Sequence, residues 1–161
     1  MKTLATLLFL AACTPMTQSQ ILCTWTGAQD QNWNNSGNWF NHTLPTHGDS
    51  LSIQGGGHQP ILAADFTAAF LHIDATASLT LGSHTLTVLG DWSNAGTLHA
   101  ETSTVVFAGS GLQLIKGNQT FYNLELNNEF GLEIYSGNDS LRGVLYLKNG
   151  NFETSGRFYL I

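Results

Sequence analysis

Charged side chains are scarce in this sequence, and basic ones are the scarcest. Asp, Glu, Lys and Arg make up 10% of the 161 residues, against roughly 25% in an average soluble chain. The five Lys and Arg residues form no cluster, which argues strongly against a nucleic-acid partner, because binding to a phosphate backbone depends on basic patches. A membrane-surface role is disfavoured as well, since no basic amphipathic helix is visible. Hydrophobic residues still reach 42%, so we expect a folded chain.

Cysteine is also nearly absent. Cys13 and Cys23 are too few for a disulfide framework, and the sequence has no C-x-x-C metal or redox motif. A chain that has lost Cys13 with a leader keeps Cys23 as a lone thiol, which in most proteins is a small buried apolar residue.

The apolar stretch near the start is too short to cross a membrane. Residues 4–12 form a stretch of about nine residues that follows Lys2, whereas a spanning helix needs about 20 apolar residues. This length and this positive flank are typical of a secretory signal peptide. We therefore predict a signal peptide over residues 1–19, no membrane span, and a protein that is extracellular or on the outer cell surface.

Two cleavage sites are compatible with this leader. Thr17 and Ser19 place small residues at positions −3 and −1, so that cleavage would release a chain beginning at Gln20. Residues 10–13, Leu-Ala-Ala-Cys, instead resemble a lipobox, in which Cys13 would be lipidated and become the new N-terminus. We favour the first site, because the mature fold can begin directly after Gln20, and the lipoprotein alternative stays open.

Helical periodicity is missing after residue 20. The best helix candidate, residues 63–71, is barely two turns long. What recurs is short apolar–polar alternation, which is typical of strands with one buried face. Turn residues such as Gly, Asn and Ser separate these stretches, as in all-β folds. The expected strands include residues 79–81, 85–88, 122–126, 132–134 and 145–148.

Internal repetition decides between the two architectures that fit such strands, a β-sandwich and a β-solenoid. Four segments recur in the same order at an offset of 51 to 54 residues. This repetition favours a right-handed parallel β-helix with two coils per repeat, each of about 20 to 27 residues. The sandwich remains the alternative. The matched pairs are 70–74 with 121–125, 79–81 with 132–134, 88–92 with 141–145, and 96–98 with 150–152.

The two ends of the sequence differ. Residues 20–60 are irregular and contain Trp25, Trp33 and Trp39, which suits an N-terminal cap that folds its aromatic rings over the first coil. Residues 61–161 then carry the solenoid repeats. Residues 157–161 read as the middle of a strand without a capping segment, so we expect the chain to be the N-terminal part of a longer protein.

Several motifs resemble the large secreted repeat proteins of Bacteroidetes, many of which are exported by the type IX secretion system. The motifs are Trp-Thr-Gly at 25–27, Trp-Asn at 33–34, Asn-Trp at 38–39, Pro45, and the segments 49–53, 77–81, 86–92, 96–98, 104–111 and 121–124. The resemblance implies an adhesin-like protein built on a β-helix, usually with a C-terminal sorting domain. This sequence has no such domain, and the resemblance supplies no catalytic residues.

Trp33 and Trp39 are the candidate glycan contacts. Exposed tryptophan rings stack on sugar faces, so a cap that displays these two rings would bind carbohydrate. The alternative, which we favour, is that both rings pack as the core of the cap.

Two serines are candidate sites of O-glycosylation. Asp-Ser-Leu occurs at residues 49–51 and again at 139–141, and it resembles the short acceptor motif of exported Bacteroidetes proteins. The modified residues would be Ser50 and Ser140.

Catalytic and metal sites are not indicated. The six histidines lack the spacing of a zinc site, so we predict no metal and no cofactor. Asp74 and Glu125 align in the repeat, and glycoside hydrolysis needs two such carboxylates, but their neighbours are neutral. We therefore predict a non-catalytic structural, adhesin-like module whose partners are extracellular glycans or surface components. A carbohydrate-binding module is the alternative, and a polysaccharide-active β-helix enzyme is the least favoured.

Overall fold

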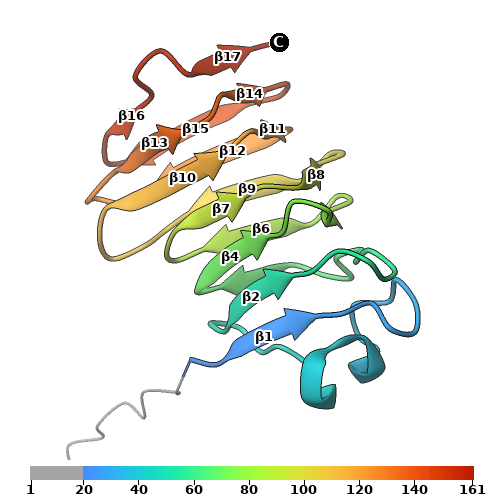
Figure 1. The fold of residues 1–161 in the computed structure, drawn as a ribbon. Helices are drawn as coiled ribbons and strands as arrows, with labels where there is room; N and C mark the ends of the chain where they lie inside the picture. The colour runs from blue at the N-terminus through green and yellow to red at the C-terminus, as the bar shows by residue number, and fades with distance from the viewer. Residues whose placement is uncertain (1–19) are drawn as a thin grey trace, which may run out of the picture.

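The computed structural model describes residues 20–161, and in this part the chain winds into a parallel β-solenoid of about six turns (Figure 1). The expected signal peptide over residues 1–19 and the candidate lipidation site Cys13 lie outside the described residues. All pairs of neighbouring strands among residues 20–161 are parallel. This confirms the solenoid and excludes the β-sandwich, whose sheets are antiparallel.

A full coil contributes one strand to each of three walls, as the strand order shows. The first wall is a seven-stranded sheet of β1 (Leu22–Trp25), β2 (Ser50–Ile53), β4 (Phe70–Ile73), β7 (Trp92–Asn94), β10 (Gln113–Gly117), β13 (Leu132–Ser136) and β16 (Phe152–Glu153). The second wall is a five-stranded sheet of β3 (Phe66–Ala68), β6 (Thr85–Val88), β9 (Thr104–Phe107), β12 (Asn123–Asn127) and β15 (Leu145–Asn149). The third wall consists of two separate sheets, one of β5 (Ser78–Thr80) and β8 (Thr97–His99), the other of β11 (Thr120–Phe121), β14 (Asp139–Leu141) and β17 (Phe158–Leu160).

The coil length follows from the register of the first wall. Leu51 pairs with Leu71, Leu71 with Trp92, Trp92 with Ile115, and Ile115 with Ile134. These steps of 20, 21, 23 and 19 residues agree with the predicted coil to within a residue. The coils stack from β1 at the base to β17 at the top (Figure 1).

Alternation along each strand builds the core. In β2, β4, β6 and β9 every second residue is buried and its neighbours are half-buried. Because the strands pair in register, inward side chains of one coil lie directly on those of the next, as Leu86, Val105 and Leu124 do in the second wall. Each fully buried Leu, Ile or Val contributes roughly 1.5–3 kcal/mol to the free energy of folding. The stacked apolar columns therefore hold the coils together.

Two sequence predictions about local structure are wrong. The repeat of 51 to 54 residues pairs segments from different walls: residues 70–74 lie on β4 of the first wall, but residues 121–125 lie on β11 and β12. The strands of all three walls share the same alternation, so unrelated walls match in sequence. The helix candidate at 63–71 is not helical, because β3 and β4 alternate inward and outward residues there.

The N-terminal end carries the predicted tryptophan-rich cap. Trp25, Trp33 and Trp39 form one cluster, with ring centroids 4.9 to 6.3 Å apart. The indole Nε1 of Trp39 donates to the Trp33 carbonyl at 2.8 Å, and that of Trp25 donates to the His58 carbonyl at 2.8 Å. Two short 3₁₀ turns, η1 (Ser36–Asn38) and η2 (Phe40–His42), carry the loop around this cluster.

The opposite end of the described residues is open. β15, β16 and β17 are edge strands of their sheets. Leu147 and Leu160 continue the columns of Leu126 and Leu141, which are buried, yet they are themselves 60% and 74% exposed. This end therefore presents unpaired backbone groups beside apolar side chains.

Candidate functional site

The two candidate sugar-stacking rings are in the core. Trp33 and Trp39 are 5% and 2% exposed, and each is in edge-to-face contact with another ring of the cluster. A sugar needs an open ring face, and neither residue offers one. The prediction that Trp33 and Trp39 contact glycans is therefore corrected, and the packing alternative describes both residues.

The two candidate O-glycosylation sites lie on strands. Ser50 is in β2 and Ser140 is in β14, and both are half-buried on the outer face. The Asp that precedes each serine is buried inside the solenoid. Burial by itself raises the pKa of Asp49, but hydrogen bonds from Thr46 and from the Ile21 N–H outweigh it, so this pKa lies below its usual value. The short Asp-Ser-Leu motif is therefore embedded in the fold.

Metal-binding and catalytic groups are scattered. Within residues 20–161, no group of three or more His, Cys, Asp or Glu side chains converges to hold a metal ion. Asp74 and Glu125, which the repeat alignment places together, belong to different walls. Asp74 pairs with His72 at 2.8 Å, and Glu125 pairs with Lys148 at 2.8 Å. The alignment of these two carboxylates is therefore also wrong.

Cys23 lies inside the solenoid, as expected for a lone thiol. It is buried and unpaired, with its Sγ 4.0 Å from an oxygen of Asp49. Burial and the nearby carboxylate both raise the pKa of this thiol, which makes it a poor nucleophile.

A polar chain in the interior was not found from the sequence. The Trp92 indole donates to Gln119 Oε1 at 3.1 Å, and the Gln119 amide nitrogen donates to Asp139 Oδ1. Asp139 is fully buried, and its second oxygen has no hydrogen-bond partner. Burial raises the pKa of Asp139 to about 7, although the bonds from Gln119 act in the opposite direction. The phase of the strand gave a signal for this position, because Asp139 stands two residues before the inward-facing Leu141.

A second interior group is fully paired. Asn128 Nδ2 donates to Gln113 Oε1 at 3.0 Å and to two backbone carbonyls. Gln113 Nε2 in turn donates to the carbonyls of Val88 and Gly90. These two side chains satisfy backbone groups where the chain turns between walls, so their role is structural.

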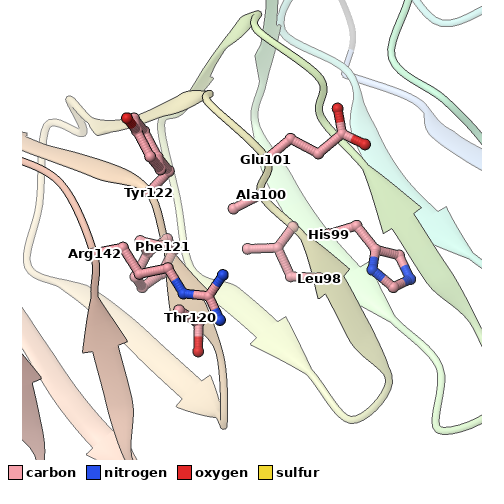
Figure 2. A pocket seen from close by; sticks show the side chains of 8 residues that line it. All are labelled: Leu98, His99, Ala100, Glu101, Thr120, Phe121, Tyr122 and Arg142. Carbon is pink, nitrogen blue, oxygen red and sulfur yellow. The ribbon is translucent and has the colours of Figure 1, made fainter. Parts of the chain in front are cut away.

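A cleft opens where the third wall is interrupted. β8 and β11 follow each other in this wall but belong to different sheets, so no strand ladder joins them. The cleft between them has a volume of about 380 Å³. Its lining consists of Leu98, His99, Ala100 and Glu101 on one side and Thr120, Phe121, Tyr122 and Arg142 on the other (Figure 2).

The charged and aromatic side chains of the cleft are accessible. Arg142, His99 and Glu101 are exposed and Tyr122 is half-buried. Figure 2 shows the Arg142 guanidinium directed toward the β8 side, with Tyr122 and Glu101 at the rim. The arrangement offers a planar hydrogen-bond donor, a carboxylate acceptor and a ring face within one depression, which is a binding chemistry.

Comparisons with protein-family models, with curated proteins and with solved structures gave no match to this chain. Among residues 20–161, no helix is both long and apolar enough to cross a membrane. The described fold and its cleft are therefore the observations on which a functional proposal rests.

Proposed function

We propose that this protein is a non-catalytic structural module, adhesin-like in kind, that works outside the cell or on its outer surface. One observation carries the proposal: inward side chains are stacked in register through successive coils of the described chain. A body held by such columns resists bending and keeps its walls in a fixed relation, which suits the display of other segments.

Surface chemistry and the leader support the location. The outer positions are polar but hardly charged, and the signal-like residues 1–19 precede the first strand. The resemblance to exported Bacteroidetes proteins is part of the same proposal. It names secretion and display as the context in which such a module works.

Export is tested with the full chain, tagged at its C-terminus and produced in a Bacteroidetes host. We expect intact cells treated with protease to lose the tag signal. The variant Leu7→Arg/Leu8→Arg, which interrupts the apolar stretch, should keep the protein inside, because the signal peptide can no longer engage the export machinery. A wild-type tag that stays protected in the cytosolic fraction would overturn the proposal.

The N-terminus of the exported protein separates the two cleavage sites. A mature chain that begins at Gln20 supports simple secretion. A lipid-modified N-terminus that is abolished by Cys13→Ala supports a lipoprotein anchor. The intact mass of the same sample also shows whether Ser50 or Ser140 carries a glycan, with Ser50→Ala/Ser140→Ala as the control.

Catalysis is tested on the same material. We expect no release of reducing ends or of unsaturated products when the purified protein is incubated with neutral and acidic polysaccharides. Turnover that copurifies with the folded protein and is lost in a variant of one described carboxylate would contradict the non-catalytic role.

A further inference from the structure

The interruption of the third wall has a local cause. The coil that runs from Trp92 to Ile115 takes 23 residues, more than its neighbours. The chain leaves β8 through a turn in which Glu101 adopts a positive φ of 48°. Next to this longer coil the ladder of the third wall stops at β8 and begins again at β11.

The interruption leaves backbone groups unpaired by strand. Thr97 and His99 turn their groups toward β5, since Thr97 N donates to Ala77 O and His99 O accepts from Leu81 N. In a parallel ladder the residue between two such positions faces the other way. Leu98 therefore turns its N–H and C=O toward the cleft.

The same argument holds on the other side of the cleft. Gln119 O and Phe121 O accept from Ser140 N and Arg142 N of the next coil. Thr120 lies between them, so its backbone groups face β8. The floor of the cleft thus carries hydrogen-bond donors and acceptors from both edges, in addition to the side chains around it.

Arg142 differs from the other basic side chains of residues 20–161. Lys116 lies over the Tyr135 ring, 5.4 Å from its centroid, and Lys148 pairs with Glu125. Arg157 donates to the carbonyls of Ile134 and Tyr135. Arg142 alone among these four has no ion pair, hydrogen bond or ring contact within the described part of the chain, and it lines the cleft.

We propose that the cleft binds a short acidic saccharide, with the sugar carboxylate on Arg142. A guanidinium binds a carboxylate through two parallel hydrogen bonds, which are stronger than neutral ones. The sugar hydroxyls, which donate and accept, match the backbone groups of Leu98 and Thr120 and the carboxylate of Glu101. The Tyr122 ring at the rim gives a face for the sugar ring. The volume of about 380 Å³ suits a small ligand.

This proposal is separate from the structural role. A module that only displays other segments needs no cleft ligand, and a cleft ligand needs no export. The two proposals therefore fail independently.

Binding is measured by isothermal titration calorimetry of the full chain with tetragalacturonate and tetraglucuronate. Their fully methyl-esterified forms, which have the same sugars without the charge, serve as matched ligands. We expect the acids to bind and the esters to bind at least about tenfold more weakly, because hydrogen bonds to a charged group are lost.

Three variants locate the site. Arg142→Gln should weaken binding about tenfold or more, and Arg142→Lys should fall between it and the wild type, since it keeps the charge without the planar fork. Lys148→Gln removes the same charge from β15, outside the cleft, and should bind as the wild type does. Arg142 is exposed, so its variants should keep the circular dichroism spectrum of the wild type.

Four results would overturn the proposal. These are no binding of either acid, equal binding of acids and esters, an equal loss in Arg142→Gln and Lys148→Gln, and tighter binding of a short peptide with a free C-terminal carboxylate than of either saccharide. The first removes the ligand, the second its charge, the third the site and the fourth the chemical class.

Discussion

Asp139 makes the stability of the solenoid depend on pH. This carboxyl is fully buried, and its pKa is raised to about 7 from an ordinary value of 3.8. The folded state therefore keeps the proton over a pH range in which the unfolded chain has already lost it. Stability is greatest below about pH 4, falls as the pH rises toward 7, and levels off above. The difference of about three pKa units corresponds to at most about 4 kcal/mol.

The substitution Asp139→Asn isolates this effect. The amide has nearly the same shape as the protonated acid and cannot ionise, so the variant should gain up to about 4 kcal/mol relative to the wild type between pH 4 and pH 8. Urea unfolding at pH 4, 5, 6, 7 and 8 gives the free energy of unfolding at each pH. The quantity to compare is the difference between variant and wild type, because the lowered pKa values of Asp30 and Asp49 act in the opposite sense, adding stability that is lost on acidification.

The control is Asp65→Asn. Asp65 accepts a hydrogen bond from the Thr85 N–H at 2.8 Å, but its side chain is exposed. This variant should follow the wild-type pH dependence in parallel. A difference between Asp139→Asn and wild type that stays constant from pH 4 to pH 8 would refute the reasoning, because Asp139 would then titrate alike in the folded and unfolded chains.

Three further substitutions test the cap, the turns and the open end. Trp39→Ala should lower the free energy of unfolding by about 3–5 kcal/mol, whereas the exposed neighbour Phe40→Ala should change it little, as measured by urea unfolding. Gly117→Ala should cost about 2 kcal/mol or more, because Gly117 has a φ of 109° and an added Cβ would lie 1.8 Å from a backbone oxygen of the preceding coil. Gly111→Ala, which meets open space, should unfold like the wild type. Leu160→Lys should reduce concentration-dependent association in sedimentation velocity, since charge on an edge strand opposes strand pairing between molecules, and unchanged sedimentation would argue against this role of the open end.

The alternation of the sequence was enough to predict the strands and the solenoid. Residues 85–88 and 132–134 lie in β6 and β13, because an apolar residue at every second position can be buried only on a strand with one inward face. The position of each strand in the stack was not predictable in the same way. All walls share one pattern, so the sequence match of 70–74 with 121–125 was no guide to contact.

The cleft was beyond reach of the sequence for a related reason. Glu101 and Arg142 are far apart in the chain and come together at a point where the ladder fails, and a missing strand pair leaves no pattern. The buried carboxylate is the opposite case. Asp139 lies in phase with Leu141, so the same alternation that predicts the strand also places this side chain inside.

The coil length sets the relation between sequence and shape. Each coil of about 20 residues adds one strand spacing, roughly 4.8 Å, along the axis, or about 0.24 Å per residue, whereas an α-helix advances 1.5 Å per residue. A chain wound in this way gives little reach for its length. In return, each outward position recurs on the wall at the strand spacing, so such a wall can act as a grating that is matched by any ligand or surface with the same period.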